Sequence, residues 1–92
     1  MRERDVEEYL VTRVKAMGGI AYKFTSPVRA NVPDRIVVLP KGLLVFVELK
    51  APGKVANPAQ LREHERLREL GQKVYVIDSL AGVEALIEEL CA

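Results

Sequence analysis

The chain of 92 residues has the length of one small domain, and its hydrophobic content of 49% is enough for a packed core, which excludes wholesale disorder. The charged start, Met1–Asp5, predicts no signal peptide, and no apolar stretch is long enough to span a membrane, so we expect a single cytoplasmic domain over residues 1–92. Cys91 is the only cysteine, cannot form a disulfide within the chain, and is not expected to act in catalysis.

The net charge of +1 hides an uneven distribution along the chain. Residues 23–54 carry six basic and two acidic side chains, whereas residues 55–92 carry four basic and seven acidic ones. A positive excess in one segment is typical of a surface that faces phosphate groups. A chance cluster of surface lysines gives the same distribution, and on charge alone this second interpretation is favoured.

The first predicted element is an amphipathic helix over residues 4–17. Val6, Leu10 and Val14 recur every four residues, which places them on one helix face, and Gly18-Gly19 ends the helix. The later elements, in chain order, are strands over residues 20–25, 34–39 and 43–50, a helix over 58–70, a strand over 73–78 and a helix that begins after Ser79.

Residues typical of helix N-termini precede both later helices. Asn57 stands before Pro58 at the start of one, and Ser79 stands before the other. The predicted order is therefore αβββαβα. Strands that are apolar on both faces, with helices before and after them, indicate an α/β domain whose central mixed sheet is covered on two sides.

Three charged residues stand at the ends of two apolar strands. Asp34 opens one strand, and Glu48 and Lys50, which share a face because they are two residues apart, close the next. A short hairpin turn places Asp34 across from them. A Mg²⁺ or Mn²⁺ ion held by both carboxylates, with the Leu49 carbonyl as a further ligand, removes the cost of burying these charges. A strand-end salt bridge between Lys50 and either acid is an equal alternative.

Pro33-Asp34 and Glu48-Leu49-Lys50 match the motif of the PD-(D/E)XK nuclease superfamily, which this sequence resembles. A longer succession of segments resembles a stand-alone virus-type replication-repair nuclease (VRR-NUC) domain, namely Tyr22–Pro27, Val32–Ile36, Phe46–Gly53, Gln60 and Val74–Asp78. The resemblance covers nearly the whole chain. It departs at Asn31, where the family usually has Gly, but Asn tolerates left-handed backbone angles, so we expect the turn to form.

The resemblance implies a restriction-endonuclease-like α/β fold and a metal-dependent endonuclease. It also implies that Asp34 and Glu48 bind the metal, that Lys50 is the catalytic lysine, and that an acid of the first helix completes the site. Glu7 lies at the edge of the buried stripe of that helix and is the chosen acid, with Glu3 in reserve. A solvated acid at a helix N-terminus is the alternative.

Other polar residues accompany the motif. Gln60 matches a family position near the active site, where an amide can orient a phosphate or a water. His64, the only histidine, lies one turn further, and we expect it to pack behind the site rather than act as a base. The predicted DNA contacts are basic and hydroxyl side chains around the site, namely Lys23, Ser26, Arg29, Arg35 and Lys54.

These residues and the resemblance predict a Mg²⁺- or Mn²⁺-dependent, structure-specific endodeoxyribonuclease of a bacterial or phage-infected cell. We expect a homodimer that cuts branched DNA such as four-way (Holliday) junctions, because one small domain offers few phosphate contacts and a two-fold pair supplies two active sites. The alternatives are a duplex or flap nuclease without junction preference, a catalytically silent nucleic-acid-binding module of the same fold, and a small α/β interaction domain.

Overall fold

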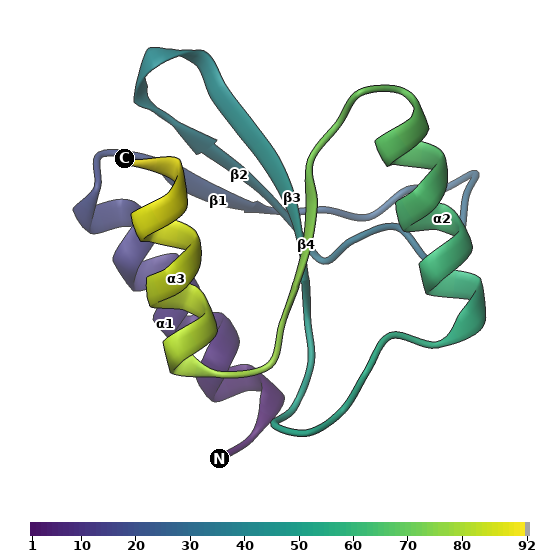
Figure 1. The fold of residues 1–92 in the computed structure, drawn as a ribbon, viewed down its shortest axis with the longest axis horizontal. Helices are drawn as coiled ribbons and strands as arrows, with labels where there is room; N and C mark the ends of the chain where they lie inside the picture. The colour runs from purple at the N-terminus through teal and green to yellow at the C-terminus, as the bar shows by residue number, and fades with distance from the viewer. Residues whose placement is uncertain (92) are drawn as a thin grey trace.

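The computed structural model describes residues 1–91, in which the elements follow the predicted order αβββαβα (Figure 1). Their bounds are α1 (Glu3–Ala16), β1 (Ile20–Lys23), β2 (Arg35–Leu39), β3 (Leu43–Leu49), α2 (Pro58–Glu69), β4 (Val74–Ile77) and α3 (Leu80–Leu90). A 3₁₀ turn, η1 (Pro40–Gly42), joins β2 to β3. The ends predicted from the sequence agree with these to within two residues. No helix within residues 1–91 combines the length and hydrophobicity needed to cross a membrane.

The four strands form one mixed sheet in the order β1-β2-β3-β4. The pairs β1–β2 and β2–β3 are antiparallel, whereas β4 runs parallel to β3 and is reached through α2. Arg35 at the start of β2 pairs with Val47 near the end of β3. Asp34, which comes immediately before β2, therefore lies beside Glu48, as the short hairpin turn predicted.

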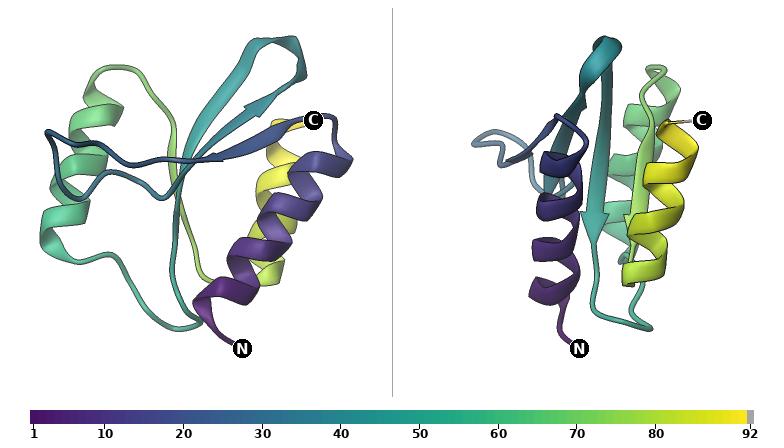
Figure 2. Two further views of the ribbon diagram at one scale, coloured as in Figure 1. Left: turned by 180° about the vertical axis from the view of Figure 1, so that it is seen from behind. Right: turned by 90° about the vertical axis from the view of Figure 1, so that its left-hand side faces the viewer.

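One face of the sheet carries the hydrophobic core. α1 and α3 lie side by side over this face in both Figure 1 and Figure 2. The buried side chains are those of the helices and of alternate strand positions, namely Val6, Leu10, Val14, Ala21, Val37, Leu39, Val45, Val47, Leu49, Ile77, Val83, Leu86 and Ile87. Leu90, near the end of α3, is only partly buried. These residues hold α1 against the strands that carry the acidic pair.

The opposite face of the sheet is covered only in part. α2 lies on this face, as the views of Figure 1 and Figure 2 agree, and it packs over β3 and β4. Ala21 points toward the core, so its neighbours Ile20 and Tyr22 point to the opposite face, where they are 53% and 54% exposed. The prediction of a sheet covered on both sides is therefore correct for the core face and only partly correct for the other.

The turn after α1 depends on two successive glycines. Gly18 has a φ of +85°, in the left-handed region that favours glycine. At Gly19 an added Cβ would lie 2.4 Å from the carbonyl oxygen of Val38, so the backbone of the turn packs directly on β2. This close approach fixes α1 against the sheet. Asn31 also has a positive φ, of 67°, so the turn expected at this residue is present.

Candidate active site

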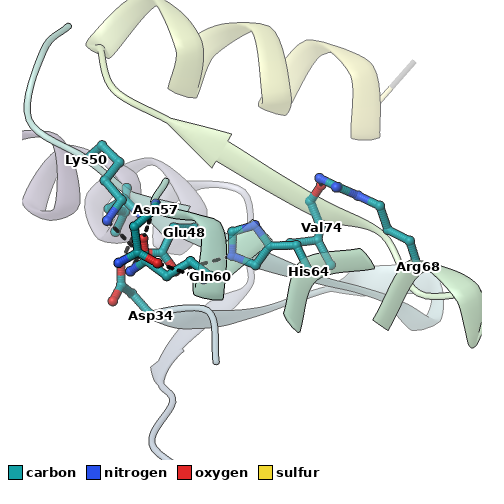
Figure 3. Close-up of polar contacts among 9 residues, drawn as sticks. Asp34, Glu48, Lys50, Asn57, Gln60, His64, Arg68 and Val74 are labelled. Atoms are coloured by element: carbon teal, nitrogen blue, oxygen red, sulfur yellow. Dashed lines mark hydrogen bonds and ion pairs between the residues drawn. The ribbon is translucent and has the colours of Figure 1, made fainter. Parts of the chain in front are cut away.

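Asp34 and Glu48 meet where β2 begins and β3 ends (Figure 3). The backbone holds Asp34 in place, because its Oδ2 accepts the N–H of Leu49 at 2.8 Å and its carbonyl oxygen accepts the N–H of Phe24 at 2.9 Å. These two hydrogen bonds tie the segment before β2 to the chain on either side of it. The carboxylate of Asp34 therefore has a defined position beside β3.

Glu48 is the most buried acid among residues 1–91, with 2% of its surface exposed. Its Oε2 accepts a hydrogen bond from Nε2 of Gln60 at 3.2 Å and lies 3.4 Å from Nζ of Lys50. Its Oε1 lies 3.5 Å from Nε2 of His64. Burial, and secondly the neighbouring carboxylate of Asp34, raise the pKa of Glu48 to about 7 against the opposing effect of Lys50.

This pair of carboxylates has the character of a divalent-cation site. Burial and the carboxylate of Asp34 raise the cost of ionising Glu48, and the single charge of Lys50 does not balance both carboxylates. Mg²⁺ and Mn²⁺ prefer oxygen ligands of this kind. The strand-end salt bridge that the sequence left open is also present, between Lys50 and Glu48. The ion pair and a bound cation are compatible, because one lysine leaves one carboxylate uncompensated.

The start of α2 orients Gln60 toward Glu48. The side chain of Asn57 accepts the N–H of Gln60 at 2.8 Å, and Oε1 of Gln60 accepts the N–H of Asn57 at 3.0 Å, which together form a capping box. Because the amide oxygen is used by the cap, the amide nitrogen is left to donate to Glu48. The sequence identified Gln60 and the helix start separately, and the structure shows that one side chain serves both.

His64 lies one turn beyond Gln60 and is completely buried. Burial, followed by the charges of Arg68 and Lys50, lowers the pKa of His64, so its ring is neutral near pH 7. Among residues 1–91, Glu48 Oε1 and both ring nitrogens of His64 are buried side-chain atoms without a hydrogen-bond partner. The expected position behind the site is correct. The only sequence signal for a closer role was its spacing of four residues from Gln60.

Glu7, the predicted third acid, is engaged elsewhere. Its Oε2 lies 2.8 Å from Nε of Arg35 and 3.3 Å from Nζ of Lys23. Arg35 also donates to the carbonyl oxygen of Ala21 at 2.9 Å, which anchors this cluster to β1. Within residues 1–91 no three His, Cys, Asp or Glu side chains are grouped to hold a metal ion. The structure therefore brings together Asp34, Glu48, Lys50 and Gln60 and leaves Glu7 with Arg35.

The predicted DNA contacts divide by exposure. Lys23 and Lys54 are exposed, and Ser26 is half-buried in the loop that leads to Asp34. Arg35 has only 17% of its side chain exposed, so it mainly holds Glu7. The basic surface around the site is therefore smaller than the sequence suggested.

Arg29 has an unexpected partner. Its Nε donates to Oε1 of Glu63 at 2.9 Å. This contact joins the loop that precedes β2 to helix α2. Glu63 is only 8% exposed and also lies 3.5 Å from Nε of Arg66. Sequence reasoning missed Glu63, because an acid in a helix as polar as α2 looks like a solvated residue. The ion pair ties the loop before Asp34 to the helix that carries Gln60.

The chain is similar to a curated protein and to a solved structure. No family model matches the sequence. A protein of Acyrthosiphon pisum secondary endosymbiont phage 1, named "Putative nuclease p44", is 57% identical over 79 residues, which are 86% of this chain and 85% of that protein. A solved structure described as a VRR_NUC domain matches with a TM-score of 0.88 and 41% identity, over 94% of each chain.

Proposed function

The chain belongs to the VRR_NUC family of nucleases, and from this premise we propose that it is a Mg²⁺- or Mn²⁺-dependent endodeoxyribonuclease that cuts branched DNA as a homodimer. The nuclease assignment comes with the family. The metal, the branched substrate and the homodimer are the proposal, as is action in the cytoplasm of an infected or bacterial cell. The observation that carries the metal-dependent cleavage is the pairing of half-buried Asp34 with buried Glu48, with Lys50 beside Glu48.

The residues of the site have different parts in phosphodiester hydrolysis. Asp34 and Glu48 would hold the cation, with the Leu49 carbonyl as a further oxygen ligand. When bound, the cation supplies positive charge to the scissile phosphate and lowers the pKa of a bound water. Lys50 orients or deprotonates the attacking water and stabilises the negative charge that grows on the phosphate. Gln60 keeps Glu48 in place through its hydrogen bond to Oε2.

Glu7 is proposed as the third carboxylate of the site, with Glu3 in reserve. It stands on α1 with its Oε2 shared between Arg35 and Lys23, so joining the other two acids requires it to leave these cations. Substrate phosphates supply a reason for the exchange, because they compete with Glu7 for the exposed ammonium of Lys23.

The DNA surface in this proposal consists of the exposed cations near the site. Lys23, Arg29 and Lys54 are exposed. Ser26 adds a hydroxyl in the loop that carries Arg29. Arg29 must give up its ion pair with Glu63 to reach a phosphate, so its contribution to binding is expected to be smaller than that of a free arginine.

A cleavage assay tests the proposal directly. The protein is incubated with labelled four-way junction, flap, duplex and single-stranded DNA, with Mg²⁺, with Mn²⁺, or with EDTA. We expect cutting only with added metal and faster cutting of the junction. Asp34→Asn keeps an oxygen to accept the Leu49 N–H, so it should remain folded while losing metal affinity in calorimetry.

The possible results separate the alternatives. Full activity in EDTA would overturn the metal assignment, and equal cutting of duplex and junction would leave a nuclease without junction preference. DNA binding without cleavage in any metal would instead identify a catalytically silent binding module.

A further inference from the structure

Two buried polar atoms face each other on the α2 side of Glu48. Nε2 of His64 lies 3.5 Å from Oε1 of Glu48, the two residues are 0% and 2% exposed, and within the described part of the chain neither atom has another hydrogen-bond partner. Buried polar atoms without partners are costly and uncommon. Figure 3 shows the imidazole of His64 directed at Glu48. The pairing of these two atoms therefore needs a physical account.

One tautomer of the imidazole satisfies both atoms. With its proton on Nε2, the ring donates to Oε1 of Glu48, and a shift of a few tenths of an ångström brings the contact into the ordinary hydrogen-bond range. With its proton on Nδ1, the ring would instead turn a lone pair toward the carboxylate. Because Gln60 and Lys50 already hold Oε2, a third contact at Oε1 fixes the rotation of the whole carboxylate.

We propose that His64 is a positioning residue, whose Nε2–H holds Oε1 of Glu48 so that the carboxylate is preorganised for the cation. The proposal rests on the proposed metal-dependent function, because the benefit of preorganisation appears when the metal binds. Partners behind a metal ligand typically change metal affinity by about 10–100-fold when they are removed. His64 acts through Glu48 and does not touch the reacting atoms.

A purely structural role for His64 is the competing explanation. α2 buries only His64 and Glu63, so the imidazole also fills space between this helix and the sheet. An apolar ring of similar size would fill that space as well. The hydrogen bond to Glu48 is the one feature that an apolar ring cannot supply, and it is the feature that the experiments isolate.

The first experiment reads the tautomer in the unmodified protein without metal, at a pH well above 7, where Glu48 is ionised and only the ring can donate in this contact. His64 is the only histidine, so ¹⁵N-labelled protein gives one set of imidazole signals in a long-range ¹H–¹⁵N correlation spectrum. We expect the neutral form with the proton on Nε2. A neutral ring protonated on Nδ1 would overturn the proposal, and this result does not depend on metal binding or cleavage.

The second experiment compares His64→Phe, which keeps an aromatic ring without a donor, with His64→Gln, whose amide nitrogen can replace Nε2–H. Mn²⁺ affinity is measured by calorimetry and folding by circular dichroism. We expect His64→Phe to bind Mn²⁺ about 10–100-fold more weakly and His64→Gln to recover most of the loss. Equal affinity of folded His64→Phe and wild type would overturn the proposal.

A matched variant on the same helix controls for weakened packing. Leu67→Ala removes a partly buried side chain one turn beyond His64 and should lower the melting temperature while leaving Mn²⁺ affinity unchanged. An equal loss of affinity in Leu67→Ala would show that helix docking, not the hydrogen bond, is responsible. Absence of Mn²⁺ binding by the wild type would count against the proposed function and leave the tautomer result to decide on His64.

Discussion

At the scale of single residues, Glu48 is the side chain whose protonation matters most. Burial and Asp34 raise its pKa from 4.5 to about 7 in the folded protein without metal. Between these values the folded state binds more protons than the unfolded state, so the free energy of unfolding falls as pH rises from 4.5 to about 7.

We therefore expect melting temperatures in EDTA to decrease across this interval, and Glu48→Gln to lose that part of the slope. Mn²⁺ affinity, measured by calorimetry, should rise over the same interval, because protons compete with the cation. The same melting slope in Glu48→Gln and wild type would show that another group is responsible.

Lys50 allows a test of chemistry separate from binding. Lys50→Ala should slow junction cleavage by about 100-fold or more, because it removes a charge aimed at the phosphate in the transition state. The fold and most of the DNA affinity should persist, as judged by circular dichroism and fluorescence anisotropy. Lys15→Ala, at an exposed position in the last turn of α1, is the matched control and should cut normally. Wild-type rates in Lys50→Ala would reduce Lys50 to a salt-bridge partner of Glu48.

At the scale of elements, local signals in the sequence were enough to place the helices and strands. Asn57 and Ser79 accept N–H groups of the helices they precede, as their positions predicted. Gly18 ends α1 with a left-handed backbone. Such signals depend on a few neighbouring residues, so they can be read without the fold.

The candidate site could be predicted only where strand pairing alone decides it. Asp34 and Glu48 meet because a short hairpin sets their register. The partner of Glu7 depends on how α1 crosses the sheet, which its own sequence does not contain. His64 and Glu63 are buried in a helix with few apolar residues, so no hydrophobic periodicity marked that face.

The turn between α1 and β1 gives a prediction for stability. Gly19→Ala would place a Cβ 2.4 Å from the Val38 carbonyl oxygen and 2.7 Å from the Leu39 side chain. The backbone of Val38 cannot move away without a cost in free energy. We therefore expect a loss of about 1–3 kcal/mol in the free energy of unfolding, measured with urea.

Gly82→Ala is the comparison variant. Its Cβ would meet side-chain atoms of Ile77 and Ser79 at 3.1 and 3.2 Å, and the change gains about 1 kcal/mol of helix propensity. A loss in Gly19→Ala no larger than that in Gly82→Ala would contradict the close approach.

At the scale of the whole molecule, the partly covered sheet face bears on assembly. Ile20, Tyr22 and Leu44 expose 53%, 54% and 45% of their surfaces. A second copy of the chain is the expected partner, because a two-fold pair doubles the basic surface and supplies two cuts across a junction.

Sedimentation should show a dimer at micromolar protein, and Leu44→Glu, which puts a charge on β3, should shift it toward monomer. Lys41→Gln, in the turn between β2 and β3, changes the net charge by the same amount and controls for it. A wild-type protein that is monomeric throughout the range would remove the homodimer and leave the nuclease assignment intact.

The double use of Gln60 links the start of α2 to whatever occupies the site. Its amide closes the helix cap and holds Glu48, so a ligand that fixes Glu48 should also slow the opening of the first helical turn. By thermodynamic linkage, Asn57→Ala, which frays that turn, should weaken Mn²⁺ binding. Hydrogen–deuterium exchange at the Gln60 and Leu61 amides should slow on adding Mn²⁺, while exchange at Val83 in α3 stays unchanged. The exchange rates of these two helix amides therefore report how much of the protein has Mn²⁺ bound, without any need for DNA.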